Sequence, residues 1–396
     1  MFENSVEYQT SYNDIYSILL YSLKIEKKLS AKEKNLIVDY LIHLNGEFSD
    51  IKTLLSKINR ISWDAAEKEI SIAIKNGVTL INILDPSYPA NLKEIPDPPL
   101  VLFVRGDLTN NLIGQTNNSP ILTIAMVGMR SASPKGKKIA QDIAEELTLH
   151  RVNIVSGLAY GIDTAAHLGA IKAVRLAKAE YGINLSPGII VLGSGVLSIY
   201  PKQNIKLAEY LLELGGCIVS EYGIFTEPQS FFFPARNRII SGLSSAVVVV
   251  EAQEKSGSLI TARLALEQGR DVFAIPGAID NHSNAGTNKL IQQGAALITC
   301  VDDILANFSK LKFKNICTTE KALAPTKSNN LAAPDLNNIE FRILNFIKTQ
   351  NNCGFDEIIE TLQVETAIAI STLNRLEMGK EIFIHPGNIY STEPFI

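Results

Sequence analysis

The chain has 396 residues, of which 46% are hydrophobic and 20% charged, and its formal net charge is −4. A chain of this length exceeds one ordinary hydrophobic core and is expected to form two or three domains. Its apolar runs are of strand length, too short to cross a membrane, and its polar, acidic start lacks the regions of a secretory signal. We therefore expect a cytoplasmic protein with no membrane partner. The overall charge gives no support to nucleic-acid binding, so such a function needs a local site.

Metal and cofactor motifs are missing from the sequence. The four cysteines stand apart without a CxxC pair, and the five histidines show no HxxxH spacing, which disfavours a zinc site or a disulfide framework. No GxxxxGK[ST] sequence is present, which excludes a Walker-type ATPase, and the first strand-to-helix turn lacks GxGxxG, which disfavours NAD. We predict no metal and no cofactor.

The N-terminal part is expected to be helical. Between residues 11 and 76, apolar side chains recur at three- and four-residue spacing, the pattern of short amphipathic helices. We assign 1–77 to a small helical (SAM-like) module, which serves for packing or for interaction with a partner. A strand beginning at Val78 and a proline-rich connector over 95–106 follow, and then a polar loop over 110–120.

The central region alternates strand and helix signals. We predict strands at 121–127, 152–155, 189–192, 217–219, 246–250, 272–275 and 296–298, and helices at 135–150, 164–180, 203–214 and 259–268. Most of the strands are continuous apolar runs, typical of parallel strands covered on both faces. The fold class is therefore α/β, with a Rossmann-like, doubly wound, mostly parallel sheet over 78–310. Ligands of such sheets lie beyond the carboxyl ends of the strands.

The C-terminal part has a different composition. Lys, Asn, Ala and Pro dominate 311–337, which we interpret as a flexible linker. Three helices at 339–349, 355–362 and 366–379, followed by a hairpin over 381–390, predict a winged-helix module over 338–396. From Glu340 onward the chain has four basic and eight acidic residues. Because phosphate binding needs local positive charge, a protein-contact or regulatory role is favoured over duplex DNA.

The first strand of the central region ends in a turn that suits an anion. Gly128 allows the backbone to turn sharply, and Ser133 or a neighbour can cap the next helix, with Pro134 at its first position. The amides exposed at that helix start attract anions, and Arg130 adds a planar fork for phosphate oxygens. Taken alone the pattern is weak, because similar turns occur in most α/β proteins.

The second strand ends in Ser156-Gly-Leu-Ala-Tyr-Gly-Ile-Asp. Asp163 is placed to cap a helix beginning near Thr164, and His167 follows four residues later on the same helical face. A Ser/His/Asp hydrolase is disfavoured, because Ser156 is not in a GxSxG elbow. We expect Asp163 and His167 to fix the loop rather than to catalyse a reaction.

Three more cations stand near aromatic residues. Lys202, Arg236 and Arg238 are expected outside the strands, with Arg236 in a loop beyond a strand end rather than in the core. A positive groove beside stacking surfaces suits single strands. Core packing is an equally good interpretation of Phe231–Phe233. Ser256-Gly-Ser-Leu-Ile-Thr-Ala then opens another helix with free amides, so that several helix N-termini converge on one edge of the sheet.

Several of these motifs together resemble one family. Gly128-Met-Arg-Ser-Ala-Ser, the run from Ser156, Phe233-Pro-Ala-Arg-Asn-Arg-Ile-Ile-Ser-Gly-Leu-Ser and Ser256-Gly-Ser-Leu-Ile-Thr-Ala look like the DNA-processing protein A family, DprA, also called Smf. They occur in the family's order over roughly Ile83 to Leu305. The resemblance implies a non-enzymatic homodimer that binds single-stranded DNA and helps load RecA recombinase in natural transformation. The tail resembles the winged-helix domain that many members carry.

The resemblance also assigns residues. Basic groups lining the DNA pocket would be Arg130, Lys202, Arg236 and Arg238. Amides and small polar contacts would come from Gly128, Ser131, Ser156, Gly157 and Asn237. The loop itself would be structured by Gly161, Asp163 and His167. The stretch 174–187 is longer than the family's usual link between helix and strand, which leaves the local loop geometry open.

Two other functions compete with this interpretation. Rossmann-like relatives include nucleotide phosphoribohydrolases of the lysine-decarboxylase-like type, but Pro276-Gly277-Ala278 does not continue into the PGGxGTxxE run expected of those enzymes. A structural partner protein with a vestigial pocket is compatible with the net negative charge.

Overall fold

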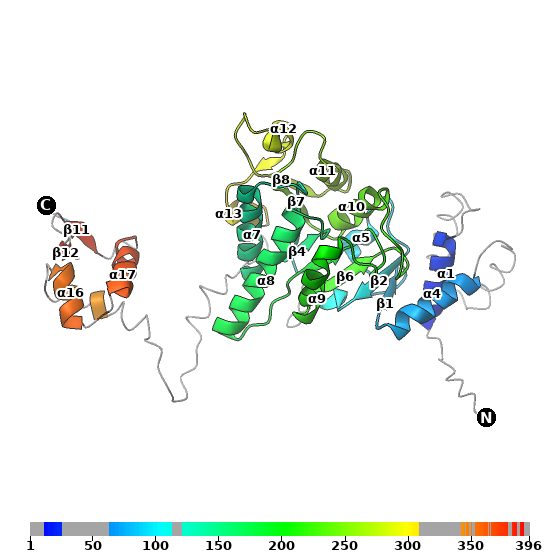
Figure 1. Cartoon of the computed structure of the whole chain (residues 1–396), viewed down its shortest axis with the longest axis horizontal. Coiled ribbons are helices and arrows are strands. Elements are labelled where there is room, and N and C mark those ends of the chain that lie inside the picture. The colour runs from blue at the N-terminus through cyan, green and yellow to red at the C-terminus, as the bar shows by residue number, and fades with distance from the viewer. Residues whose placement is uncertain are drawn as a thin grey trace, which may run out of the picture. The chain divides into compact units, whose positions relative to one another are not determined.

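The computed structural model describes residues 12–25, 63–112 and 121–308. In the C-terminal part it describes 342–344, 346–347, 350, 353–362, 364, 366–378, 382–385 and 389–391. The chain divides into two compact units, Met1–Leu323 and Ala324–Ile396 (Figure 1). Most of the predicted helical module and all of the predicted linker lie outside the described residues, so the domain limits stay predictions.

One mixed sheet runs through the larger unit. Within the described residues its order is β1-β2-β6-β5-β4-β3-β7-β8-β9. The strands are β1 (Thr79–Asn82), β2 (Val101–Arg105), β3 (Thr123–Val127), β4 (Asn153–Ser156), β5 (Ile189–Val191), β6 (Cys217–Ser220), β7 (Ala246–Val249), β8 (Asp271–Ala274) and β9 (Ala296–Leu297). All pairs from β6 to β9 are parallel, whereas β1–β2 and β2–β6 are antiparallel. The doubly wound, mostly parallel sheet is confirmed, with every predicted strand of 121–298 present.

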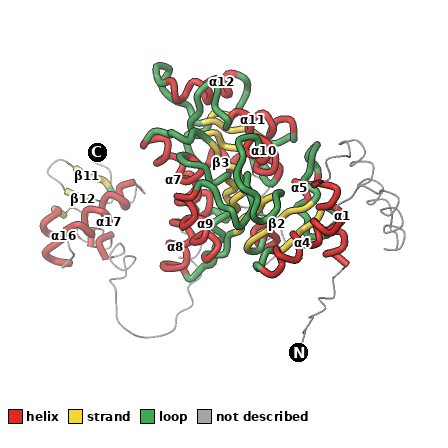
Figure 2. The backbone as a smooth tube through the Cα atoms, turned by 45° about the vertical axis from the view of Figure 1, so that its right-hand side comes forward, coloured by secondary structure: helices red, strands yellow, loops and turns green. Residues whose placement is uncertain are grey.

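The helices of this unit cover both faces of the sheet (Figure 2). They are α1 (Tyr12–Ile25), α4 (Trp63–Lys75), α5 (Ala90–Lys93), α6 (Leu108–Leu112), α7 (Pro134–Leu149), α8 (Ile162–Tyr181), α9 (Ile205–Glu213), α10 (Phe232–Gly242), α11 (Ser258–Glu267), α12 (Ala285–Gln292) and α13 (Val301–Ala306), with 3-10 turns at Lys202–Asn204 and His282–Asn284. In β3, Ile124 and Met126 join a core with α7 and α8, whereas Ala125 and Val127 join one with α10 and α11. This alternation is what a strand buried on both faces requires.

Two parts of the sequence differ from their predicted structure. The proline-rich connector contains β2, whose Phe103 and Val104 pair with Ser220 and Val219 of β6, so this segment is part of the sheet. Its residues 101–104 are fully buried, which makes pairing obligatory for their backbone groups. The segment 232–242, for which no helix is predicted and in which Arg236 is expected on a loop, forms α10. No glycine or proline interrupts its interior between Pro234 and Gly242, and Ile239 and Ile240 bury its apolar side.

The N-terminal helices share the core of the sheet. Leu19, Leu20 and Leu23 of α1 and Ile70 of α4 are buried in one cluster with β2. The Tyr21 ring lies edge-on to that of Phe103, with 5.1 Å between centroids. These helices are therefore packed on the α/β domain. Among the helices that the structure describes, none has the length and apolar character to cross a membrane.

The smaller unit has the elements of a winged helix. Its described elements include α16 (Phe355–Leu362), α17 (Thr366–Met378) and a sheet in the order β10-β12-β11. Here β10 is Cys353–Gly354, and β11 (Phe383–His385) pairs antiparallel with β12 (Ile389–Ser391) as the predicted hairpin. A small core with Ile358, Leu373 and Ile382 holds them together.

Candidate functional site

A cavity of about 580 Å³ opens at the carboxyl ends of the parallel strands. The chain reverses its strand order between β3 and β7, and such switch points are where doubly wound sheets bind ligands. The loops that follow β3, β4, β5, β6 and β7 all contribute. The lining residues are Val127, Gly128, Arg130, Ala159, Asp163, Tyr200, Pro228, Ser230, Phe233, Pro234, Arg236, Asn237, Ile240, Ser256, Gly257, Ser258, Ile260 and Thr261.

Arg130 presents an exposed cation at the rim of the cavity. Its guanidinium carbon lies 5.3 Å from the centroid of the Phe233 ring, a cation–π contact. The Phe233 ring in turn lies 5.6 Å from that of Tyr200. Phe233 is half-buried and Phe231 is 63% exposed, so the aromatic run at 231–233 borders the site instead of filling the core.

Arg236 lies inside the protein rather than on a loop. It belongs to α10 and is only 4% exposed, which corrects the expected exposed position. Its Nη1 donates a 2.9 Å hydrogen bond to the Gly157 carbonyl and another to the Val191 carbonyl. Burial lowers the pKa of Arg236 to about 10, partly opposed by Asp163, so the side chain is charged at pH 7. Its Nε has no partner among the described residues.

Asp163 organises the loop that Arg236 contacts. One of its carboxylate oxygens accepts hydrogen bonds from the amides of Gly157 and Ala159, both at 3.2 Å. Asp163 was expected to cap α8, but it does not. The helix already begins at Ile162, and the Asp163 side chain turns back to the amides that precede the helix. Burial raises the pKa of Asp163 to about 6, against the charge of Arg236.

Two further residues of this loop are tightly enclosed. Gly161 has φ +80°, and a Cβ there would collide with the Met129 carbonyl, so the position requires glycine. His167 is fully buried, and burial lowers its pKa to about 3, so its imidazole is neutral. Both residues therefore lie in the scaffold under the cavity.

Helix α7 begins with the predicted cap, and two amides at its start already have acceptors within the protein. The Ser133 hydroxyl accepts a 2.9 Å bond from the Gly136 amide, and Pro134 is the first helical residue. The buried Glu251 carboxylate then accepts the Ser133 amide at 2.8 Å. The expectation that these amides are free for an anion is therefore wrong for Ser133 and Gly136, because the Glu251 carboxylate and the Ser133 hydroxyl already accept them. The α11 start, Gly257-Ser258, lines the cavity and has no side-chain cap.

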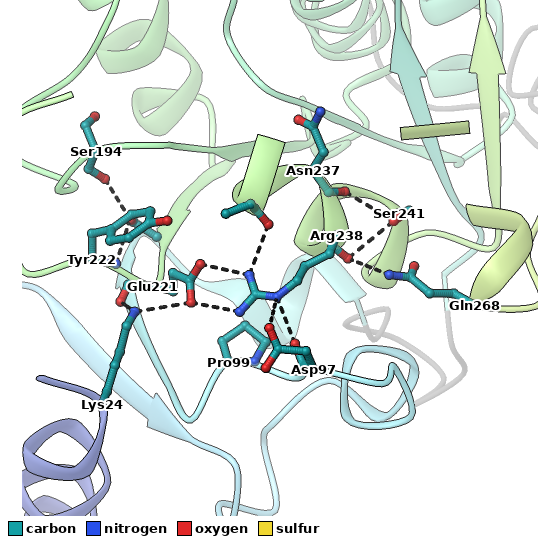
Figure 3. Close-up of polar contacts among 12 residues, drawn as sticks. Lys24, Asp97, Pro99, Ser194, Glu221, Tyr222, Asn237, Arg238, Ser241 and Gln268 are labelled. Carbon is teal, nitrogen blue, oxygen red and sulfur yellow. Dashed lines mark hydrogen bonds and ion pairs between the residues drawn. The ribbon is translucent and has the colours of Figure 1, made fainter. Parts of the chain in front are cut away.

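Arg238 points into a different set of contacts (Figure 3). Its Nη1 and Nη2 donate to the two carboxylate oxygens of Glu221 at 2.8 and 2.9 Å, and its Nε donates to the carbonyl and carboxylate of Asp97 at 2.9 Å. Burial alone would lower the pKa of Arg238, but Glu221 and Asp97 raise it. Arg238 is not among the lining residues, and these contacts favour a structural role.

The remaining predicted residues divide between the cavity and its surroundings. The lining includes Gly128, Arg130, Arg236 and Asn237; outside it lie Ser131, Ser156, Gly157, Lys202 and Arg238. Ser156 is buried and donates to the Met126 carbonyl at 2.6 Å, which ties β4 to β3. Lys202 is exposed in the turn after Tyr200. Tyr200, Phe233 and Ser258 line the cavity but are missing from the predicted site residues, although Phe233 and Ser258 belong to two of the motifs quoted from the sequence and Tyr200 lies two residues before the predicted Lys202.

The fold and the cavity define a Rossmann-like α/β protein with a cationic, aromatic-edged site at the switch point. The model of the family described as DNA recombination-mediator protein A matches residues 79–309. The chain belongs to this family, and its function is that of a DNA-processing recombination mediator. The predicted family is thereby confirmed, and the phosphoribohydrolase alternative is not favoured.

Individual relatives agree with this assignment. The chain is 42% identical over 246 residues to the DNA processing protein DprA of Bacillus subtilis, covering 62% of this chain and 75% of that protein. It is 44% identical over 227 residues to DprA of Streptococcus pneumoniae, covering 57% and 73%. The X-ray structure of the S. pneumoniae protein aligns with a TM-score of 0.54 and 34% identity, over 77% of this chain and 94% of that one.

Proposed function

We propose that the chain acts by binding single-stranded DNA in the cavity at the carboxyl ends of β3 and β7. The observation that carries this proposal is the placement of two arginines on one cavity beside aromatic rings. Arg130 is exposed at the rim over Phe233, and Arg236 is held below it with an Nε that has no partner in the described part of the chain. Guanidinium groups suit phosphate oxygens, and exposed rings suit unstacked bases.

The concave shape favours a single strand over a duplex. The cavity is lined by the loops at the ends of the β-strands. It can take up a flexible single strand of DNA, whose bases are free to stack on Phe233 and Tyr200. In a duplex those bases are stacked on each other and unavailable. Phosphate contacts carry no sequence information, so binding is expected to be insensitive to base sequence.

A comparison of ligands tests this function. Fluorescence anisotropy is measured with labelled single strands, duplexes of the same sequence, and mononucleotides as competitors, with and without EDTA. We expect a clear preference for single strands and no effect of EDTA, since no cluster that could hold a metal ion occurs among the described residues. Equal affinity for duplex and single strands, or loss of binding in EDTA, would contradict the proposal.

Membership of the family also supports a proposal about the assembly and the protein partner of the chain. We propose that the protein acts without catalysis in the cytoplasm, as a homodimer that passes single strands to RecA. Light scattering on the purified chain measures its mass. RecA ATPase activity on strands coated with a single-strand-binding protein measures loading, and no stimulation by this chain would contradict the role.

A further inference from the structure

The loop after β6 is bound by helix α1 on one side and by helix α10 on the other. Residues 221–224, here called the 221–224 loop, follow β6 and precede the segment that enters α10. Glu221 is 5% exposed and its carboxylate is shared by Arg238 of α10 and Lys24 of α1, whose Nζ lies 3.2 Å away. Figure 3 shows the two cations on opposite sides of this carboxylate. Lys24 of α1 and Arg238 of α10 therefore both form ion pairs with the buried carboxylate of Glu221.

The N-terminal helices contact this loop at further points. Lys24 also donates to the Glu221 carbonyl, and its Nζ lies 4.8 Å from the centroid of the Tyr222 ring. Glu69 of α4 accepts a 2.8 Å hydrogen bond from the Ile224 amide. At Gly223 an added Cβ would lie 2.5 Å from the Tyr21 hydroxyl and 2.6 Å from the Glu69 carboxylate. Both α1 and α4 are therefore in direct contact with the loop.

The loop, in turn, contacts both ends of the site-bearing part of α10. Tyr222 packs on Phe232 at the first residue of the helix, with 4.0 Å between ring centroids. Glu221 binds Arg238, which lies six residues, or about 1.7 helical turns, further along α10. Between these two attachments lie Phe233, Arg236 and Asn237, all of which line the cavity. A shift of the 221–224 loop would move these three side chains together.

We propose that the N-terminal helices position the DNA site through the 221–224 loop, with Lys24 as the principal positioning residue. This inference rests on the proposed function of the cavity. Lys24 is not among the cavity-lining residues, so its effect on DNA is indirect. Its contact with Glu221 is partly buried, so removal of the Lys24 charge leaves a buried carboxylate with one cation fewer.

Lys24→Met tests the inference, because it keeps the length of the side chain and removes the charge. We expect affinity for single strands to fall about three- to tenfold, in the range of mutations that act through a connecting element. The salt dependence should stay unchanged, because no phosphate contact is lost. Lys24→Arg should restore the affinity. The matched control is Lys172→Met, which removes an exposed ion pair with Glu145 on the helices α7 and α8 and should leave affinity unchanged.

A second measurement separates this inference from the proposed function. Hydrogen exchange of the α10 amides, followed without DNA, should be faster in Lys24→Met than in the wild type and in Lys172→Met. If the wild type fails to bind single strands, the proposed function is wrong, and the exchange data alone decide whether the helices are coupled. Should Lys24→Met not fold, Glu69→Ala removes another contact on the same loop and is expected to give the same result. Unchanged exchange of α10, or a salt dependence that becomes shallower, would overturn the inference.

Discussion

The guanidinium of Arg236 lies against the backbone of Gly157, whose carbonyl accepts a 2.9 Å hydrogen bond from Nη1. A Cβ at position 157 would lie 2.5 Å from Nη2, so the absence of a side chain there creates the space that the arginine occupies. The two residues belong to separate motifs of the sequence, 79 positions apart. Their contact connects the loop after β4 to helix α10.

Gly157→Ala is expected to displace Arg236 from its position. Because Gly157 and Arg236 are both buried, the added methyl group has no free space. It should lower the free energy of unfolding by about 1–3 kcal/mol, the usual cost of overpacking. Affinity for single strands should fall as well. Thermal melts and anisotropy titrations measure the two effects. A variant with wild-type stability and affinity would show that Arg236 does not need this position.

Arg130→Ala should weaken DNA binding without affecting folding. The side chain is exposed and its cation–π contact with Phe233 is at the surface, so the melting temperature should stay close to that of the wild type. Loss of one phosphate contact should make the salt dependence shallower by about 0.7 log units of affinity per log unit of salt. Affinity measured across a salt series checks this. An unchanged slope together with a lower melting temperature would assign Arg130 to the scaffold.

Arg238→Ala should lower the stability of the fold and leave the salt dependence of DNA binding unchanged, the opposite of what is expected for Arg130→Ala. It leaves Glu221 buried with Lys24 as its remaining partner, and breaking such a pair costs about 3 kcal/mol or more. Burial would raise the pKa of Glu221, but Lys24 and Arg238 lower it to about 2. The pairing thus stabilises the fold above the ordinary glutamate pKa of about 4.3, and this stabilisation is lost as the pH falls through about 2.

Denaturant unfolding of wild type and Arg238→Ala at several pH values measures this difference. It should be largest near pH 7 and shrink below about pH 4. A variant that keeps wild-type stability at pH 7 but loses affinity with a shallower salt slope would instead place Arg238 among the DNA contacts.

DNA binding should become tighter in mild acid because of Asp163. Burial raises its pKa to about 6, and it lines the same cavity as Arg130 and Arg236. As the pH falls from about 7.5 to about 5, the carboxylate takes up a proton and ceases to repel phosphates. The gain is at most about tenfold for each unit by which bound DNA raises this pKa. His167, with a pKa lowered to about 3, stays neutral over this range.

Asp163→Asn is the matched variant for this prediction. Its amide oxygen can still accept the Gly157 and Ala159 amides, so the loop should persist. The variant should bind with nearly constant affinity between pH 7.5 and 5. A pH dependence equal to that of the wild type would show that another group is responsible.

Removal of the tail from about Leu311 should leave most of the DNA binding intact. The cavity belongs to the unit Met1–Leu323, and all of its lining residues lie between Val127 and Thr261. The tail also has more acidic than basic residues from Glu340 onward. Anisotropy titrations of full-length and shortened chain make the comparison. A folded, shortened chain that no longer binds single strands would contradict the charge argument.

The α/β fold and the edge of the sheet at which the site lies could be predicted from the amino-acid sequence alone. Apolar runs of strand length, such as Ala246–Val249, are readable because parallel strands are buried on both faces. Gly128 and the Ser133–Pro134 cap were readable because turn and cap chemistry is local. The Arg236–Ser244 run was specific enough to indicate the family.

The surroundings of each arginine, by contrast, depend on how the chain folds in three dimensions. Arg236 and Arg238 are two positions apart on α10, and their side chains enter different surroundings, a cavity wall and a pair of carboxylates. The sequence signal for both is the same, because the partners Gly157, Val191, Asp97 and Glu221 come from distant segments. Likewise Glu251 occupies the start of α7 across 118 positions of sequence. Burial and charge pairing depend on such long-range contacts, and these are set by the folded chain as a whole.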